Sequence, residues 1–366
     1  MALSIEQVTD ALKNVNHPSG NTDIVSLKMV QNISIGEDKI NFMLVFSKPN
    51  DPFASSIKKA CIKVLESVFE KKYSIIINEQ FAAKNESSEF ASLEKVKNIV
   101  LITSGKGGVG KSTVSVNLAI AVAHTGAKVA LLDADVYGPS IPIMFGAEDF
   151  QPGLITENGK EMIVPLEKFG IKLQSVGFFI KPGEALIWRG PMATNALKQI
   201  IAQTAWGELD YLFIDSPPGT GDIHLTLVQE MPITGAIIVS TPQNLALADA
   251  IKAINMFKSE NINVPVLGIV ENMAWFTPAE LPENKYFIFG KDGSTNLAKK
   301  LNISVLGQIP IVQSICENGD NGKPTAINPF TIEGKAFTVV AENVIAEIEK
   351  RNASLPPTKK VKISHQ

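Results

Sequence analysis

Residues 105–112 read Gly-Lys-Gly-Gly-Val-Gly-Lys-Ser and decide the fold of most of the chain. They satisfy the phosphate-loop pattern G-x-x-x-x-G-K-[ST], with the apolar run 99–102 before them and a helix-forming stretch after them. Glycines at these places let the backbone turn tightly, so that successive N–H groups face phosphate oxygens. Lys111 is expected to reach the β and γ phosphates, and Ser112 to bind Mg²⁺. The stretch therefore predicts a nucleotide site.

Acidic residues that follow two further apolar runs are expected to complete this site. Asp133 and Asp135 follow the run Val-Ala-Leu-Leu, and Asp215 follows the run Tyr-Leu-Phe-Ile. Ligands of open α/β sheets bind beyond the carboxyl ends of the strands, where these acids fall. Asp215 suits a magnesium site, whereas Asp133 has a second interpretation as an acid that caps a helix or a turn. Residues 216–222 (Ser-Pro-Pro-Gly-Thr-Gly-Asp) form a segment that is expected to rearrange when the γ-phosphate leaves.

The pattern of apolar residues around these motifs predicts an α/β domain. Wholly apolar runs without polar alternation are typical of strands that are buried on both faces, as in a mostly parallel sheet covered by helices. Helical stretches separate these runs, and the last helix is expected at 334–350. The runs occupy residues 99–102, 129–132, 211–214, 236–239 and 266–270.

The first part of the chain has a different pattern of apolar residues, which predicts a small α+β domain over residues 1–79. Apolar residues at helical spacing begin it, two strand-like stretches at 24–35 and 39–46 flank a hairpin signal, and an amphipathic helix and a strand close it. Polar, aperiodic residues 80–96 are expected to form a linker. The P-loop domain then covers 97–350, and the basic tail 351–366 is expected to be disordered.

Composition restricts the class of protein. A length of 366 residues favours two domains, and 45% hydrophobic with 19% charged residues is ordinary for a globular protein. The net charge of −3 argues against a general nucleic-acid binder. The two cysteines are far apart, which fits a reducing compartment. The N-terminus lacks the pattern of a signal peptide, and the longest apolar run, 114–123, is too short to span a bilayer. We therefore expect a cytoplasmic protein with no membrane or nucleic-acid partner.

The loop with two lysines is the deviant Walker A form, and it resembles the SIMIBI-class ATPases, which include MinD, ParA, the nitrogenase iron protein and the Mrp/ApbC group. Further stretches are similar to the Mrp/ApbC group in particular, and the N-terminal domain looks like the small domain found in iron–sulfur assembly proteins. The resemblance covers nearly the whole chain. The matching stretches are 133–140 (Asp-Ala-Asp-Val-Tyr-Gly-Pro-Ser), 188–192 (Trp-Arg-Gly-Pro-Met), 215–222, 271–273 (Glu-Asn-Met) and 288–290 (Ile-Phe-Gly).

This resemblance implies an ATP-hydrolysing iron–sulfur cluster carrier or assembly factor that works as a nucleotide-dependent homodimer with client or scaffold proteins. Lys106 would cross the dimer interface to the partner's phosphates, beside Lys111, and Asp135 would orient the attacking water. Asn272 would read the adenine edge, with Pro242 and Gln243 nearby. Mg²⁺ would be held by Ser112, Asp135 and Asp215. The other residues expected to contact ATP are Gly105, Gly107, Gly108, Val109, Gly110 and Thr113.

One part of the family pattern is missing. Relatives that carry clusters have a Cys-x-x-Cys pair just after the Asn-Met motif, so that two chains supply the four thiolates of a [4Fe–4S] cluster. Residues 272–281 of this chain contain no cysteine. Cys316 is the remaining ligand candidate, and it would give only two thiols per dimer. Cys61 lies on the apolar face of its expected helix and is interpreted as a small core residue.

Other functions stay open at this point. A regulatory or scaffold ATPase of the same family would keep the switch and lose the cluster. A MinD/ParA-like positioning ATPase would need a membrane-binding helix or a DNA-binding surface, and the short tail offers no long amphipathic stripe. A small-molecule kinase would need an acceptor site, for which no second constellation is visible. Trp275 and Phe276 would either dock a partner or pack internally.

Overall fold

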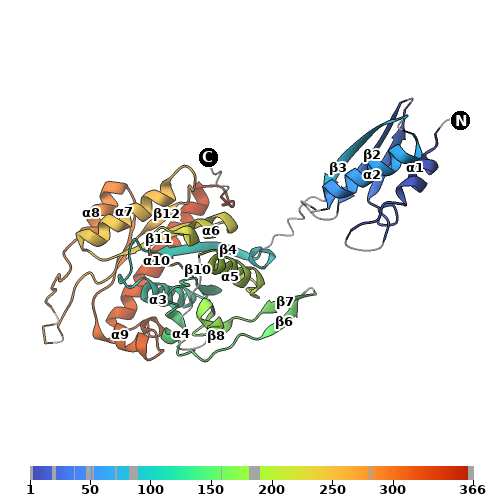
Figure 1. The fold of residues 1–366 in the computed structure, drawn as a ribbon. Helices are drawn as coiled ribbons and strands as arrows, with labels where there is room; N and C mark the ends of the chain where they lie inside the picture. Colours follow the sequence, from blue (N-terminus) through green and yellow to red (C-terminus); the bar gives the residue numbers. More distant parts are fainter. Residues whose placement is uncertain are drawn as a thin grey trace. The chain divides into compact units, whose positions relative to one another are not determined.

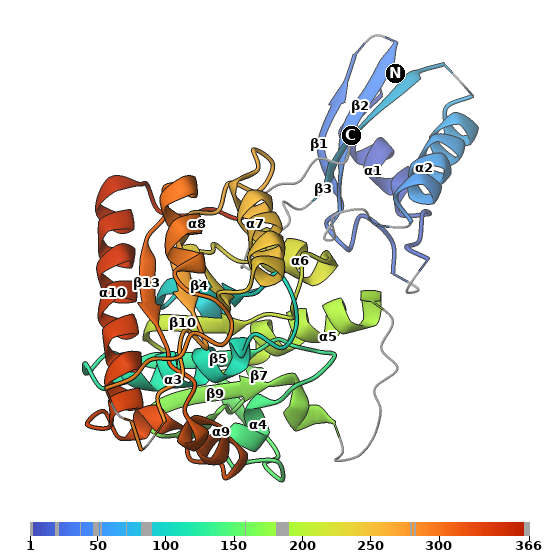
Figure 2. The same cartoon turned by 90° about the vertical axis from the view of Figure 1, so that its left-hand side faces the viewer.

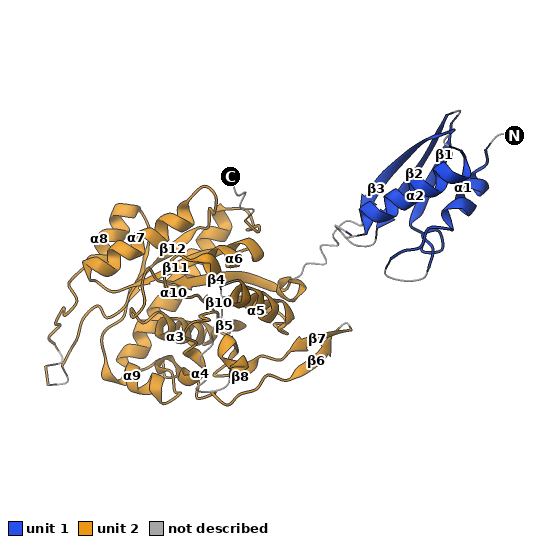
Figure 3. Cartoon of the chain, viewed as in Figure 1, with its two compact units in different colours: residues 1–89 blue, residues 90–366 orange. Residues whose placement is uncertain are grey.

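The structure is a computed structural model that describes residues 3–18, 22–36, 38–46, 51, 53–70, 72–81, 90–157, 159–180, 190–278, 280–281 and 283–361. The chain forms two compact units, residues 1–89 and residues 90–366 (Figure 3). The division falls inside the linker expected at 80–96, but both ends of that stretch are structured. Residues 80 and 81 belong to a strand of the small unit, while Phe90 and Leu93 are buried in the core of the large unit.

The small unit packs two helices against one face of a three-stranded sheet (Figure 1). The middle strand, β2, is antiparallel to β1 and parallel to β3. Every second residue of β2 from Ile40 to Phe46 is buried, as expected for a strand with one covered face. The elements are α1 (Ile5–Leu12), β1 (Val30–Ile35), β2 (Lys39–Phe46), α2 (Ala54–Val68) and β3 (Ser74–Phe81).

Two details of the small unit bear on the predictions. The strand predicted over 24–35 begins only at Val30, because the side chain of Asp23 accepts hydrogen bonds from the N–H groups of Val25 (3.0 Å) and Ser26 (2.8 Å) and holds a turn there.

Cys61 is confirmed as a core residue: it is fully buried, and burial raises the pKa of its thiol to about 12.

The large unit is built on an eight-stranded sheet with the order β13-β12-β11-β4-β10-β5-β9-β8, parallel throughout except for β8. All five predicted apolar runs lie within its strands, which confirms the predicted fold class. The strands are β4 (Val96–Thr103), β5 (Val129–Asp133), β8 (Leu166–Lys168), β9 (Ile171–Ser175), β10 (Leu209–Asp215), β11 (Gly235–Ser240), β12 (Val266–Glu271) and β13 (Val305–Gln308), and a separate hairpin comprises β6 (Leu154–Glu157) and β7 (Lys160–Ile163).

Helices cover both faces of this sheet (Figures 1 and 2). Along β4, Ile99 and Leu101 point into one core, and Val100 and Ile102 into the other, which explains the lack of alternation in the sequence. The first core contains α5 (Gly190–Gln203), α6 (Asp222–Glu230), α7 (Asn244–Lys258) and α8 (Gly293–Leu301). The second contains α3 (Lys111–Ala123), α4 (Ile141–Met144) and α10 (Ile332–Ser354), with α9 (Gln313–Asp320) beside α4. Short 3₁₀ turns occupy Ala91–Leu93, Val176–Phe179 and Thr325–Ile327.

The C-terminal segment is more ordered than its composition indicates. Helix α10 runs past its predicted end at 350. The segment that follows it packs against other residues of the large unit. Thr358 Oγ1 donates to the Pro232 carbonyl (2.9 Å), Val361 N donates to the Val228 carbonyl (3.1 Å), and Lys360 Nζ lies 5.0 Å from the ring centre of Phe90. The prediction of a disordered tail is therefore wrong for residues 351–361. In the described part of the chain no helix, α10 included, combines the length and apolar character needed to cross a bilayer.

Candidate nucleotide-binding site

The phosphate loop joins β4 to α3, as the sequence predicts. Gly105 is required by space and Gly110 by backbone conformation. A Cβ on Gly105 would lie 2.1 Å from the backbone carbonyl carbon of Asp249, so any side chain would force α7 away. Gly110 caps α3 with φ +80°, a left-handed conformation that other residues rarely adopt. The loop therefore presents its backbone and the N-terminus of α3 to an anion.

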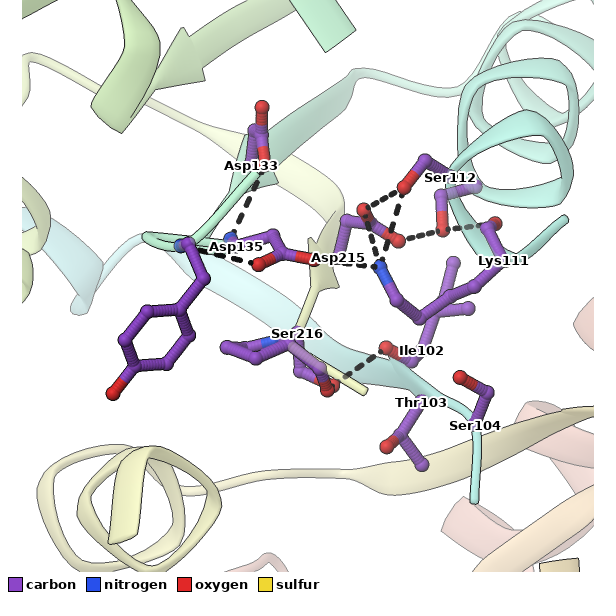
Figure 4. Close-up of polar contacts among 12 residues, drawn as sticks. Ile102, Thr103, Ser104, Lys111, Ser112, Asp133, Asp135, Asp215 and Ser216 are labelled. Carbon is purple, nitrogen blue, oxygen red and sulfur yellow. Dashed lines mark hydrogen bonds and ion pairs between the residues drawn. The ribbon is translucent and has the colours of Figure 1, made fainter. Parts of the chain in front are cut away.

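Asp215 is the centre of the polar cluster below the loop (Figure 4). Its side chain is fully buried, and its Oδ2 lies 2.7 Å from Lys111 Nζ and accepts a hydrogen bond from Ser112 Oγ at 2.7 Å. Its Oδ1 accepts a hydrogen bond from Ser115 Oγ. The structure thus brings together Lys111, Ser112 and Asp215 as expected. Ser115 was missed, although its spacing of three residues from Ser112 places both hydroxyls on one face of a helix.

Asp133 lies directly across from Asp215 in the register of β5 and β10. Its Oδ2 accepts hydrogen bonds from Ser175 Oγ (2.9 Å) and Ile141 N (3.4 Å), and its Oδ1 accepts one from Asp135 N (3.2 Å). These contacts support the interpretation of Asp133 as an acid that holds a turn. Burial, reinforced by the neighbouring Asp215 carboxylate, raises the pKa of Asp133 to about 7.

Asp135 is the acid nearest to the open side of the cluster. Its Oδ2 is 4.0 Å from Lys111 Nζ, its side chain is 13% exposed, and its Oδ1 accepts a hydrogen bond from Tyr137 N at 3.3 Å. Burial raises the pKa of Asp135, and the Lys111 ammonium acts in the opposite direction. One ammonium group thus faces three carboxylates, and its contact with Asp215 places a cation where Ser112 and Asp215 would otherwise hold a metal ion. This oxygen donor set, with Lys111 as the stand-in cation, fits Mg²⁺.

The titration of Asp133 gives a test in the nucleotide- and magnesium-free protein. The folded pKa of about 7 exceeds the ordinary value of 3.8, so the folded chain binds the extra proton between these pH values and its stability falls as the pH rises through them. From pH 4 to pH 8 the stability difference between Asp133→Asn and wild type should shift in favour of the variant by roughly 4 kcal/mol at most. Urea unfolding across this pH range measures the shift, with the exposed Asp149→Asn as control. Parallel curves for Asp133→Asn and wild type would contradict it.

The residues expected around the base lie beyond the ends of β11 and β12, which are neighbours in the sheet. Asn272 is buried, and its Nδ2 donates to the Val109 carbonyl of the phosphate loop at 2.9 Å. Its amide nitrogen therefore supports the loop in this structure. Pro242 and Gln243 precede α7, and the Pro242 carbonyl lies against Gly293 at the start of α8.

The other predicted loop residues differ in exposure. Lys106 is partly exposed, and its carbonyl accepts a hydrogen bond from Ser104 Oγ at 2.9 Å. Gly107 and Gly108 are exposed, and Thr113 lies partly buried in the first turn of α3. Trp188 and Arg189 of the 188–192 motif lie outside the described residues.

The segment after Asn272 is held by backbone bridges and carries no thiolate. Phe276 forms backbone bridges with both Tyr286 and Ile311, and Lys285 Nζ lies 4.0 Å from the ring centre of Trp275. The Trp275 and Phe276 side chains are partly buried, so packing and partner docking both stay predictions for them. The described residues include no group of three or more His, Cys, Asp or Glu side chains that could hold a metal ion.

Cys316 lies on α9 and is exposed, with its Sγ 3.7 Å from Asp320 Oδ2. The negative charge of Asp320 raises the pKa of the thiol, which lowers the fraction of thiolate available to a metal. The structure thus leaves Cys316 accessible, and among the described residues it belongs to no group of three or more potential metal ligands.

The strand–loop–helix unit, the paired lysine and serine, and the acids at the ends of adjacent strands define a P-loop NTPase. Comparison with known proteins agrees. Residues 95–345 match the family described as NUBPL iron-transfer P-loop NTPase, and residues 5–74 match the iron–sulfur cluster assembly protein family. The chain belongs to the NUBPL iron-transfer P-loop NTPase family.

Individual relatives cover both units or only the large one. The iron-sulfur cluster carrier protein of Synechocystis is 39% identical over 94% of this chain and 98% of its own length. The iron-sulfur cluster transfer protein NUBPL of Dictyostelium discoideum is 44% identical over 70% of this chain and 79% of its own. A nucleotide-binding protein of Archaeoglobus fulgidus, solved in complex with ADP, is 37% identical over 69% of this chain and 98% of its own, with a TM-score of 0.58.

Proposed function

We propose that this chain is an ATP-hydrolysing iron–sulfur cluster carrier that works as a nucleotide-switched homodimer, with the cluster as its cargo. The observation that carries the proposal is the buried group of Lys111, Ser112 and Asp215 under the phosphate loop, in a chain whose relatives along nearly its full length are named cluster carriers. We place the protein in the cytoplasm, with iron–sulfur scaffolds or clients as its partners.

When ATP binds, the side chains under the phosphate loop must exchange their contacts with one another for contacts with phosphate and Mg²⁺. Lys111 leaves Asp215 for the β and γ phosphates, because their charge is greater than that of one carboxylate. Ser112 and Asp215, with Asp135 nearby, would hold Mg²⁺, which neutralises phosphate charge when bound. Asp135 orients the attacking water from its place beside Lys111, and Lys106 reaches the phosphates of the partner protomer. Loss of the γ-phosphate then releases segment 216–222 and loosens the dimer.

Adenine recognition is proposed for Asn272 together with Pro242 and Gln243. The Asn272 Nδ2 already holds the Val109 carbonyl, so the carboxamide joins the phosphate loop to the end of β12. The same side chain would therefore report occupancy of the base site to the loop that holds the phosphates.

A second function is favoured by one observation, the absence of cysteine from residues 272–281. A regulatory or scaffold ATPase of this family would hydrolyse ATP and act on partners without holding a cluster. The carrier proposal requires that Cys316 of both protomers supply two thiolates and that partners or small thiols supply the rest, because a [4Fe–4S] cluster takes four.

Anaerobic reconstitution distinguishes the two functions. The purified protein is incubated with an equal mixture of ferrous and ferric iron and with sulfide, with and without glutathione as a source of further thiolates, and iron, sulfide and the visible spectrum are measured. We expect about four irons per dimer with glutathione, retention of iron in Cys61→Ala, and its loss in Cys316→Ser. Background iron in the wild type under both conditions, in protein that still hydrolyses ATP, would establish the regulatory function instead.

A further inference from the structure

A buried histidine joins the two segments that flank the proposed phosphate site. His224 lies in the first turn of α6 and is 1% exposed. Its Nε2 lies 3.0 Å from Thr103 Oγ1 and 3.1 Å from Ser216 Oγ. Thr103 is the last residue of β4 before the phosphate loop, and Ser216 directly follows Asp215. One ring nitrogen therefore contacts both the strand that carries the loop and the start of the switch segment.

The switch segment contacts His224 at both of its ends. Beyond the Ser216 contact with the ring, the backbone N–H of His224 donates to the Gly221 carbonyl at 3.0 Å. Ser216 in turn is hydrogen-bonded to the Ile102 carbonyl (Figure 4). The first and last residues of 216–221 are thus both hydrogen-bonded to His224, which belongs to the helix that follows them.

The imidazole is neutral in this place. Burial, together with the nearby Lys111 ammonium, lowers the pKa of His224 to about 4, so the ring carries a single N–H at physiological pH. Its Nδ1 is buried and has no hydrogen-bond partner among the described residues. The tautomer with the proton on Nε2 leaves no buried N–H group unpaired, and in it His224 donates to the hydroxyl oxygen of Ser216 or Thr103.

We propose that His224 is a positioning residue for the ATPase reaction, which sets segment 216–221, and with it Asp215, relative to the phosphate loop. This inference rests on the proposed ATPase function. The described residues also tie this segment to β4 and the loop through backbone acceptors: Ser216 N and Oγ each donate to the Ile102 carbonyl (3.0 Å), and Gly219 N donates to the Ser104 carbonyl (2.8 Å). When the Gly219 bond breaks as the segment moves, the Ser216 contacts hold its start and the His224 contacts keep its end in register for its return.

Two substitutions separate the hydrogen bond from the packing of the ring. His224→Leu keeps an apolar side chain of similar bulk and removes the N–H, whereas His224→Gln keeps an amide N–H that reaches the place of Nε2. For His224→Leu we expect kcat for ATP to fall on the order of 100-fold, as for misplaced catalytic groups, with KM changed less than about threefold. His224→Gln should recover most of kcat. Thr103→Val, which deletes one partner hydroxyl, should lower kcat in the same sense.

Hydrogen exchange gives a readout that needs no turnover. In nucleotide-free protein the amides of 216–222 should exchange faster in His224→Leu than in wild type or His224→Gln, while β4 amides stay protected. Wild-type kcat and wild-type exchange in His224→Leu would overturn the proposal, and so would equal loss of kcat in the Gln variant with unchanged exchange. If His224→Leu does not fold, the same measurements on Thr103→Val and His224→Gln decide it. Lack of ATP hydrolysis by the wild type would instead reject the proposed function, and the exchange data would still test the positioning.

Discussion

Replacing Lys106 by alanine should lower ATP turnover by about 10³-fold or more while ATP binding persists, since a cation supplied across an interface is worth that much in related phosphoryl transfers. Lys106 lies in the loop but is partly exposed, whereas Lys111 is buried against Asp215. In the proposed mechanism Lys106 therefore serves the partner protomer, and Lys111 serves the site of its own chain. Steady-state hydrolysis and calorimetric ATP binding on the same preparation measure both quantities.

Subunit mixing tests whether Lys106 acts across the interface. Neither Lys106→Ala nor Lys111→Ala should hydrolyse ATP alone. In a mixed dimer, however, the site of the Lys106→Ala chain has its own Lys111 and receives Lys106 from its partner. An equal mixture should therefore regain about a quarter of the wild-type rate, because half of the dimers are mixed and each holds one complete site. A mixture that stays inactive would show that Lys106 serves its own protomer, and unchanged turnover in Lys106→Ala would remove its catalytic role altogether.

Asp215→Ala should abolish magnesium-dependent hydrolysis and lower the free energy of unfolding of the nucleotide-free protein by about 3–5 kcal/mol. The Lys111 ammonium, 2.7 Å from the Asp215 carboxylate and 6% exposed, would lose its closest counter-charge inside the protein. The hydroxyl groups of Ser112 and Ser115 would lose their acceptor at the same time. Guanidinium unfolding without nucleotide measures the stability, and hydrolysis at varied Mg²⁺ measures the activity.

The matched control is Asp210→Ala on the same strand. Asp210 pairs with Lys97 at 2.8 Å, but the Lys97 side chain is 74% exposed, so its removal should cost about 1 kcal/mol or less. If Asp215→Ala costs no more than Asp210→Ala, the buried pair makes no special contribution to stability, and Lys111 is neutralised by Asp133 and Asp135 instead.

Most of the large unit could be predicted because each sequence pattern in it involves residues that are close together in the chain. The glycine spacing of 105–110 and the unbroken apolar runs each report on one strand or one turn, and the structure places all of them as expected. The side-by-side placement of Asp133 and Asp215 required the strand order, since β5 and β10 start 80 residues apart in the sequence, at Val129 and Leu209, and pair directly. The general rule that ligands bind at strand ends was enough to group them.

Other parts of the site depend on which strands pair with each other, and the spacing of residues in the sequence does not indicate this. Ser175 reaches Asp133 because β9 pairs with β5, and His224 reaches Thr103 because β4 and β10 are neighbours. The short strands β6 to β8 have no continuous apolar run. The tail was predicted as disordered from its lysines and prolines, but its backbone groups find acceptors at Val228 and Pro232, and composition cannot indicate those.

The contact between Lys360 and Phe90 has a consequence for how the chain is organised. Phe90 is the first described residue of the large unit and Lys360 is among the last, so the described part of this unit begins and ends at nearly the same place. Domains whose ends meet in this way tolerate circular permutation and insertion, because their core is complete whichever end carries the extra polypeptide. The small unit is attached through one of these adjoining ends. We therefore expect the large unit to fold as an ATPase core whether or not the small unit is attached.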